Sequence, residues 1–581
     1  MDQKLHDLLE WANTRKIFVD PRIEFQVTDD RGVIAVAKED IDKGKDLIKV
    51  PRDLALTPTL AASFFGDAWT SPHDRNEQLQ LFLARLKFGE EDTIVDGVNI
   101  SKKMAPYIKF LPSTGRETGL PYFWTEEEKD LLSGTDAEVF LKKFMDEIVE
   151  EWHSAVTGLV SITITNDMEK FYQDYKKGYY NKGMAYFLEQ KMTWTSFQAY
   201  LWAHCVLASR AFPFILFDSS NKLHKAFLIP VIDLLNHKNG TSVCWYVSDD
   251  HDMVFSSLED ASKLKKGSEL FNNYGDKPNY ALLLGYGFAI PDNEFEITTL
   301  SLKVPKSYLE AAKKFGVKLP EDASDRGINF ELTKKCPISD SLIDFFAFLV
   351  RLTSENNIYT TRMLLEGLAN LQAILGTKLD AFRKFKLITD RRVAPSVIKM
   401  VKVYRNSQKA IFVLAEQTTI KLEKELLKKF KALSFKKILK RDKVFFNSLL
   451  LTFGISNYND LVSKKILDQA VLLWIIRNAN KSHYKDLDPL LFPEFIYEEF
   501  QDVKKNVPIT EKDVLEFRSV YKSLFPALSQ RIPEVYNVGD WSPRNFIVAG
   551  TVSDRLTFKK PSNSEVFFLK KEEAKPRFGK H

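Results

Sequence analysis

The chain is 581 residues long, and we expect two or three domains because hydrophobic cores usually stop growing near roughly 250 to 300 residues. Hydrophobic residues make up 44% and charged residues 28% of the chain, a balance that excludes a mainly disordered protein. The net charge of +5, from 83 basic and 78 acidic residues, permits a nucleic-acid partner but does not imply one.

The cysteines and the apolar runs limit the location and the chemistry. Cys205, Cys244 and Cys336 lie far apart in sequence, so we expect neither a disulfide framework nor a structural zinc cluster, and no metal. The N-terminus mixes charges into its apolar positions, unlike a signal peptide. Apolar runs elsewhere are shorter than the roughly 20 residues that span a bilayer. We expect a cytoplasmic protein, with a nuclear share also allowed.

The first 50 residues predict a helix followed by strands. Leu5, Leu8 and Trp11 have nearly helical spacing, which indicates a short amphipathic helix. Residues 23–27 alternate between apolar and polar side chains, and residues 33–37 and 47–50 are rich in strand-forming residues. Turn residues at 29–32 and 42–44 separate these runs.

A helical insertion is expected at about residues 75–205. Thr125 followed by Glu128 has the spacing of a capping box. Phe140, Phe144, Ile148 and Trp152 recur every four residues, which indicates the buried face of one helix.

Strand character returns at residues 227–302, and helical spacing dominates after Pro305, for example at Leu364, Leu368, Leu371 and Leu375. We therefore expect an α+β domain at residues 1–305 and a helical domain at 306–558. A partly disordered tail is expected at 559–581 because the end of the chain is rich in Lys, Glu and Pro.

Five short motifs occur in one order along the first 305 residues: GVIAVAKEDI at 32–41, Trp202 with SRAF at 209–212, DLLNH at 233–237, NYG at 273–275 and GYGF at 285–288. In content and order they resemble SET-domain protein methyltransferases of the Rubisco large-subunit lysine methyltransferase-like family. The nearest likeness is to the fungal ribosomal-protein lysine methyltransferases. The helical remainder resembles that family's C-terminal substrate-binding domain in class only.

The resemblance implies a β-rich SET core that binds S-adenosyl-L-methionine and methylates protein lysine. It makes Tyr274 the catalytic residue, with its hydroxyl directed at the transferring methyl group. It assigns cofactor contacts to Arg31, Gly32, Arg210, Asn236, His237 and Tyr274. The segment of Asn236 and His237 would pass beneath the chain that carries Tyr274, a rare exception to unknotted topology.

The resemblance also places oxygens of Ser209, Arg210 and Asp233 around the lysine ammonium and makes Tyr286 an aromatic wall of the lysine channel. One departure concerns the residues before Val33. The family often has Gly-x-Gly there, whereas this chain has Asp30-Arg31-Gly32. Because glycines allow close backbone approach, Asp30 implies an altered local path or a looser cofactor contact.

The reaction requires a neutral lysine amine. The pKa of lysine in water is about 10.4, but a dry aromatic channel beside a sulfonium cation would lower the pKa of the amine by desolvation and like-charge repulsion. Such an enzyme depends more on placement and exclusion of water than on a strong base.

Several alternatives stay open at this stage. The target could be cytochrome c rather than a large-subunit ribosomal protein, the methylated residue could be histidine, or the chain could be a catalytically silent SET-like binding module. The lysine-rich stretch 421–443 is either a solvated helix face or a docking surface for an acidic partner or ribosomal RNA. We expect a monomer with a protein substrate.

Overall fold

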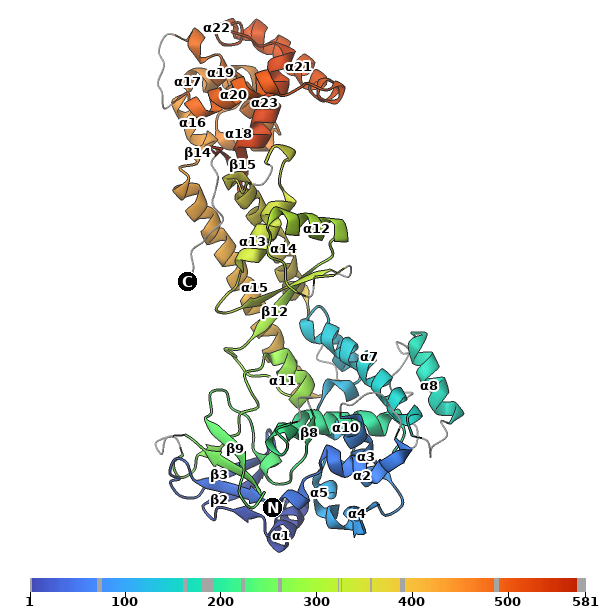
Figure 1. Cartoon of the computed structure of the whole chain (residues 1–581). Coiled ribbons are helices and arrows are strands. Elements are labelled where there is room, and N and C mark those ends of the chain that lie inside the picture. Colours follow the sequence, from blue (N-terminus) through green and yellow to red (C-terminus); the bar gives the residue numbers. More distant parts are fainter. Residues whose placement is uncertain are drawn as a thin grey trace. The chain divides into compact units, whose positions relative to one another are not determined.

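The computed structural model describes residues 3–69, 76–159, 165–178, 192–220, 225–259, 264–321, 323–324, 327–355, 358–386, 392–484 and 491–571. The chain folds into two compact units (Figure 1). Unit 1 contains Met1–Ile297 and Phe385–Gln408, and unit 2 contains Thr298–Lys384 and Lys409–His581. Within the described residues, no helix combines the length and the apolar character needed to cross a bilayer.

The strands of unit 1 form two small antiparallel sheets. One has the order β11-β3-β2, with β2 at Ile23–Thr28, β3 at Gly32–Ala37 and β11 at Glu269–Leu270. The other has the order β1-β4-β10-β9, with β1 at Phe18–Val19, β4 at Asp46–Val50, β9 at Val243–Val247 and β10 at Met253–Ser257. In β2 the residues Ile23 and Phe25 are buried while Glu24 and Gln26 are exposed, as the alternation predicts. Figure 1 shows β2, β3 and β9 lying together in unit 1.

Helices fill the region where the insertion is expected. They are α2 (Pro58–Phe65), α3 (Glu77–Phe88), α4 (Ile100–Lys103), α5 (Ala105–Phe110), α6 (Glu126–Asp130), α7 (Asp136–Thr157), α8 (Asn166–Lys176) and α10 (Phe197–Arg210). The capping box of Thr125 and Glu128 is confirmed at the start of α6. Trp152 on α7 and Trp202 on α10 are fully buried and belong to one continuous core with the helix α1 (Gln3–Thr14).

Short pairs of strands complete unit 1: β5 (Ile94–Val95) with β6 (Val98–Asn99), and β7 (Phe212–Pro213) with β8 (Ala226–Phe227). The strand expectation for residues 227–302 is wrong in one place, where α11 (Asn279–Tyr286) is a helix. Pro278 caps this helix in an extended conformation, and Gly287 ends it with φ +76°. Its apolar residues Leu282–Leu284 are buried, so the apolar run belongs to a short helix and not to a strand.

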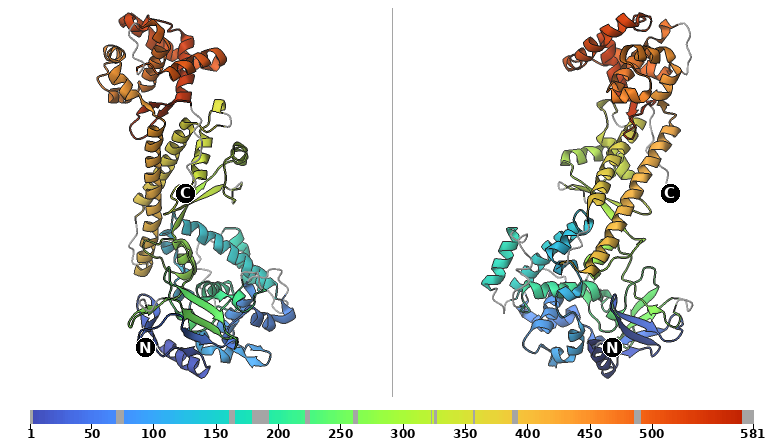
Figure 2. Two further views of the ribbon diagram at one scale, coloured as in Figure 1. Left: turned by 60° about the vertical axis from the view of Figure 1, so that its left-hand side comes forward. Right: turned by 180° about the vertical axis from the view of Figure 1, so that it is seen from behind.

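Unit 2 is mainly helical around two cores. The first core contains α12 (Lys306–Phe315), α13 (Asp340–Leu349), α14 (Thr361–Lys384) and the second half of α15 (Pro395–Lys429). Its two-stranded sheet pairs β12 (Ile297–Leu302) with β13 (Ile328–Thr333). The expected apolar face, from Leu364 to Leu375, is buried on α14. Figure 2 shows α14 running beside α15, and the ring of Phe382 lies 5.8 Å from that of Phe412.

The second core of unit 2 contains the last helices: α16 (Phe435–Arg441), α17 (Lys443–Phe453), α18 (Tyr458–Ser463), α19 (Leu467–Ala479), α20 (Glu494–Asn506), α21 (Glu511–Arg531), α22 (Pro533–Tyr536) and α23 (Pro543–Leu556). A sheet β14-β16-β15 closes this core with Leu433–Ser434, Val566–Phe568 and Thr557–Lys559. The two sheets of unit 2 are an addition to the expected all-α domain.

Two expectations for this region need correction. Residues 559–571, expected to begin a disordered tail, pair through β16, and Phe568 is fully buried there. The rest of the tail, residues 572–581, lies outside the described residues. The lysine-rich stretch 421–443 is not one helix, because Lys431 adopts φ +48° and the chain turns after α15 before entering β14 and α16.

Candidate active site

A pocket of about 540 Å³ in unit 1 gathers the predicted site residues. This volume suits a cofactor or small-molecule site, which typically spans about 300 to 1,000 Å³. The walls come from the β2–β3 turn, the end of α5, the end of α10, residues 233–237 and residues 271–289. All nine predicted residues line it: Arg31, Gly32, Ser209, Arg210, Asp233, Asn236, His237, Tyr274 and Tyr286.

Two chain segments that are distant in sequence meet at this pocket. The backbone N–H of Asn272 donates to the carbonyl of Asn236 at 2.7 Å, and Lys238 N–H donates back to the carbonyl of Asn272 at 3.1 Å. This makes a parallel bridge between His237 and Asn272. The backbone N–H and carbonyl of His237 itself have no recorded partner among the described residues, so both remain for a ligand.

A strained turn delivers the first of these segments. Val231 is a buried β-branched residue with φ +72° and ψ −47°, and Ile232 N–H donates to the carbonyl of Pro230 at 2.9 Å. This is the uncommon, strained form of the γ-turn, and such strain tends to occur at functional sites. No sequence signal predicts it, because valine normally avoids positive φ.

Hydrogen bonds fix both the hydroxyl and the backbone N–H of Tyr274. Its hydroxyl donates to the carbonyl of Leu235 at 2.7 Å, and its backbone N–H donates to Nδ1 of His237 at 3.0 Å. Its ring stacks on that of Tyr286, with centroids 4.7 Å apart. Burial raises the pKa of the Tyr274 phenol well above its usual value, so the phenol stays neutral. Because its hydroxyl hydrogen is donated to the carbonyl of Leu235, the phenolic oxygen can only accept from a pocket ligand.

His237 is a neutral imidazole of one tautomer. Its Nδ1 accepts from Tyr274, so Nε2 carries the proton and donates to Oδ1 of Asn239 at 2.8 Å. Burial is the main cause that lowers the pKa of His237. The side chain thus positions the backbone of Tyr274, and His237 itself lines the pocket.

The amide of Asn236 is oriented by two acceptors. Its Nδ2 donates to the carbonyl of Val33 at 3.0 Å and to Oε1 of Glu269 at 3.1 Å. The amide oxygen is therefore left as an acceptor for a ligand. Glu269 also forms an ion pair with Arg31, whose side chain is otherwise half exposed. Sequence reasoning missed the role of Glu269, since a lone acidic residue at a strand start carries no motif.

The turn between β2 and β3 shows which backbone path the chain takes after Asp30, where the family often has a glycine. Thr28 pairs with Gly32 across the turn, and Gly32 takes φ +66°. Asp30, Arg31 and Gly32 all line the pocket. The single glycine is thus sufficient for the left-handed position of this hairpin.

A buried polar triad includes two lining residues, Arg210 and Asp233, and Tyr107, which does not line the pocket. Oδ2 of Asp233 accepts from the hydroxyl of Tyr107 at 2.8 Å and from Nη1 of Arg210 at 3.3 Å. Oδ1 of Asp233 is buried without a partner among the described residues. Burial raises the pKa of Asp233, and the positive charge of Arg210 opposes that rise. Tyr107 was missed by sequence analysis because it lies on a helix outside every motif.

Two further predicted residues, Ser209 and Arg210, make different hydrogen bonds at the end of α10. The hydroxyl of Ser209 donates to the carbonyl of Cys205 at 2.8 Å, one turn earlier in α10. Its oxygen keeps an acceptor position. Arg210 donates to the backbone carbonyl and to the carboxylate of Asp233 and lies 5.7 Å from the ring of Phe110.

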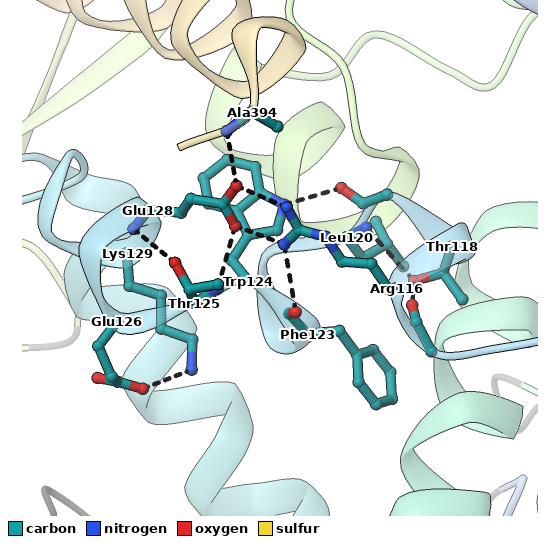
Figure 3. A network of polar contacts seen from close by, with 12 residues as sticks. Arg116, Thr118, Leu120, Phe123, Trp124, Thr125, Glu126, Glu128, Lys129 and Ala394 are labelled. Atoms are coloured by element: carbon teal, nitrogen blue, oxygen red, sulfur yellow. Dashed lines mark hydrogen bonds and ion pairs between the residues drawn. The ribbon is translucent and has the colours of Figure 1, made fainter. Parts of the chain in front are cut away.

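Arg116, which directly precedes the pocket residues Glu117 and Thr118, belongs to a polar network around Glu128 (Figure 3). The buried carboxylate of Glu128 forms an ion pair with Arg116 and accepts from the backbone N–H groups of Thr125 and Ala394 at 3.0 and 3.1 Å. Although burial opposes it, these contacts lower the pKa of Glu128. The network connects the turn beside the pocket to the residue that precedes α15.

Comparison with known proteins identifies the class to which this fold belongs. The crystal structure of the SET domain of LSMT bound to methyl-lysine and AdoHcy superposes with a TM-score of 0.51 at 18% identity, over 73% of this chain and 93% of that one. The fold is therefore that of a SET-domain protein. Residues 297–430 match the family described as the EFM1 middle domain.

The sequence relatives give the family. Protein-lysine N-methyltransferase EFM1 of Saccharomyces cerevisiae is 36% identical over 98% of both chains. Ribosomal lysine N-methyltransferase 1 of the same organism is 28% identical over 89% of this chain and 92% of its own. The chain belongs to the family of SET-domain protein-lysine N-methyltransferases that includes these fungal enzymes and resembles the Rubisco large-subunit methyltransferase.

Proposed function

We propose that this protein transfers a methyl group from S-adenosyl-L-methionine to a lysine of a component of translation, with Tyr274 as the catalytic residue. The observation that carries the proposal is the meeting of Tyr274 with the Asn236–His237 segment in one pocket. The phenol is fixed on the carbonyl of Leu235, directly before Asn236.

The residues present fit this cofactor. The free backbone N–H and carbonyl of His237 suit the edge of an adenine, which offers one acceptor and one donor. The amide oxygen of Asn236 suits the ammonium of the methionine part, while Arg31, Gly32 and Arg210 line the same space. When bound, S-adenosyl-L-methionine supplies an electrophilic methyl group on a sulfonium.

The part of the pocket lined by Ser209, Asp233 and Tyr286 fits a lysine side chain. Oδ1 of Asp233 is a buried acceptor without a partner in the described structure, and Ser209 offers a second oxygen. Tyr286 stacks on Tyr274, and the two rings together narrow the channel for the lysine side chain. The phenolic oxygen of Tyr274 accepts an N–H of the amine and so directs the nitrogen lone pair toward the methyl carbon. Exclusion of water favours the neutral amine that attack requires.

The substrate is proposed from the relatives. One of them is named a ribosomal lysine methyltransferase, and its match covers 89% of this chain. A ribosomal protein of the large subunit is therefore the first candidate. We place the enzyme in the cytoplasm as a monomer, with the helical region after residue 305 contributing to the grip on the substrate protein and ribosomal RNA contact playing a minor part.

The test uses cell extracts from a strain that lacks this gene. Incubation with purified protein and labelled S-adenosyl-L-methionine should label a ribosomal protein, with a mass increase in multiples of one methyl group. Amino-acid analysis should return methyl-lysine. Methyl-histidine would establish the alternative reaction, and labelled cytochrome c would establish the alternative substrate.

A matched pair of variants tests the catalytic residue. Tyr274→Phe should lower kcat by about 100-fold or more, because it removes a positioned polar group at the reacting atoms, while calorimetry should show retained cofactor binding. Tyr246→Phe, at an exposed tyrosine outside the pocket, should keep full activity. An unchanged rate in Tyr274→Phe would exclude the proposed role, and absent cofactor binding by the intact protein would favour a silent SET-like module.

A further inference from the structure

A second large cavity lies in unit 2, apart from the residues of the proposed active site. It measures about 840 Å³ and is bounded by the end of α20, the loop 507–510, α21 and the start of α23. We call it the α21 groove. Large apolar side chains form its floor: Val507, Ile509, Val514, Phe517, Tyr521 and Ile547.

The floor of the α21 groove is built on a packed core. A Cβ atom at Gly550 of α23 would lie 2.2 Å from Cζ of Phe517, so the missing side chain allows that ring to rest on α23. Tyr521 contacts Phe546 edge-on at 5.2 Å. Both residues thus contact α23 and also line the groove. Val514 on the same helix also lines the groove and is 47% exposed.

The rim of the α21 groove is cationic. Lys505, Arg518, Lys522 and Arg544 line it, and no acidic side chain does so within the described residues. Arg544 donates to the carbonyl of Lys504 at 3.3 Å. No ion pair is recorded for Lys505, Arg518 or Lys522 in the part of the chain that the structure describes. The N-terminus of α23, at Pro543, adds the positive end of a helix dipole.

We propose that the α21 groove docks an acidic segment of the substrate protein that carries large apolar side chains. This inference rests on the proposed function and deepens it, because it states which feature besides the target lysine is recognised. The apolar floor would bury the large side chains of such a segment. The cations would meet its carboxylates, which gives both steering and specificity. A nucleic acid would satisfy the cations but leave the apolar floor in water.

Binding of a defined probe tests the groove directly. The probe is a fluorescent synthetic helix-forming peptide of Glu, Leu and Phe, compared with the same peptide in which Lys replaces Glu. Fluorescence anisotropy should show at least about tenfold tighter binding of the acidic peptide to the full-length protein, as charge complementarity requires. The double variant Arg518→Glu/Lys522→Glu should lose that preference, and Val514→Asp should weaken binding independently.

The matched control reverses two exposed lysines of α12, in Lys313→Glu/Lys314→Glu. This variant carries the same change of charge but should keep the affinity of the unchanged protein within about twofold, because its charges lie outside the residues that line the groove and are screened by salt. Equal loss in both double variants would overturn the groove in favour of a diffuse charge effect. Tighter binding of an RNA oligonucleotide than of the acidic peptide would also overturn it.

Methyl transfer supplies the second readout. Groove variants should raise KM for the protein substrate by about tenfold with kcat and cofactor affinity unchanged, because docking lies outside the chemistry. Unchanged KM in an active enzyme would refute the docking role. Failure of the intact protein to methylate lysine would instead refute the proposed function, and the peptide measurement would still decide whether the groove binds an acidic segment.

Discussion

At the scale of single residues, the pocket depends on buried polar groups whose partners are few and defined. One carboxylate oxygen of Asp233 accepts hydrogen bonds from Tyr107 and Arg210, and the other oxygen has no partner in the described structure. An unpaired buried acceptor costs free energy. That cost is offset if a lysine ammonium or amine donates to it, which explains why the carboxylate is held in this orientation.

Tyr107→Phe should therefore impair the enzyme without removing any group that touches the cofactor. Loss of the donor leaves Oδ2 of Asp233 with Arg210 alone, and a hydrogen bond to a charged group contributes about 1.5 to 3 kcal/mol. We expect KM for the substrate to rise more than kcat falls, measured by steady-state kinetics. Tyr200→Phe is the matched control, because Tyr200 is equally buried and its hydroxyl has no partner among the described residues. Equal effects of the two substitutions would contradict the positioning role of Tyr107.

His237 should make stability depend on pH. Burial lowers its pKa in the folded protein, so the unfolded imidazole binds a proton near pH 6.5 and the folded one only at lower pH. Stability should then decrease as pH falls below about 6.5, by roughly 1.4 kcal/mol for each pKa unit of difference. Urea denaturation at pH 7.5 and 5.5 should show this loss relative to His237→Gln. An NMR titration that places His237 above pH 6.5 would disprove it.

At the scale of elements, α11 shows how a short helix sets the shape of the pocket. It begins after Pro278 and ends at Gly287, which adopts φ +76° directly after Tyr286. A Cβ atom at Gly287 would lie 3.3 Å from the backbone of Gly119. The wall of the pocket thus depends on one glycine for both conformation and space.

Two alanine substitutions in this segment should have opposite effects on stability. Gly287→Ala should destabilise the protein by about 1 to 2 kcal/mol, because an L-residue is strained in the left-handed region, and it should also lower kcat/KM. Gly285→Ala lies within α11 with no atom within 4 Å of its new Cβ. It should stabilise the protein by about 0.5 to 1 kcal/mol. Thermal denaturation measures both, and a stable, fully active Gly287→Ala would show that the left-handed position is not required.

At the scale of the whole molecule, unit 1 has one core and unit 2 has two. The proposed cofactor site lies entirely in unit 1, whereas the α21 groove lies entirely in unit 2. Helix α15 begins in unit 1 and continues into unit 2 without interruption. Units with separate cores can unfold in separate transitions.

Cofactor binding should therefore stabilise one transition selectively. At a cofactor concentration 100 times Kd, the stabilisation is about 2.7 kcal/mol for the unit that binds. Differential scanning calorimetry should show two transitions, of which S-adenosyl-L-methionine raises only one. Asn236→Ala should abolish this shift. A cofactor that raises both transitions equally would show that the units unfold together.

The linear sequence was enough to assign the SET class and to name nine residues that line one pocket. Motif residues and their order are local information, as are the capping box of Thr125 and the apolar periodicity of α14. These features need no knowledge of distant contacts. The roles of the nine residues in binding and catalysis stay predictions.

Folding decided the rest. Tyr107 contributes to the site only because it meets Asp233, which is 126 positions away in sequence, and Glu269 matters only because it reaches both Asn236 and Arg31. The γ-turn at Val231 contradicts the local preference of valine, and the helix α11 replaces an expected strand because burial of its leucines suits a short helix. The α21 groove has no motif, since its lining residues come from three helices and the loop 507–510. Long-range packing can override local propensity, so partners of this kind become visible only in the folded chain.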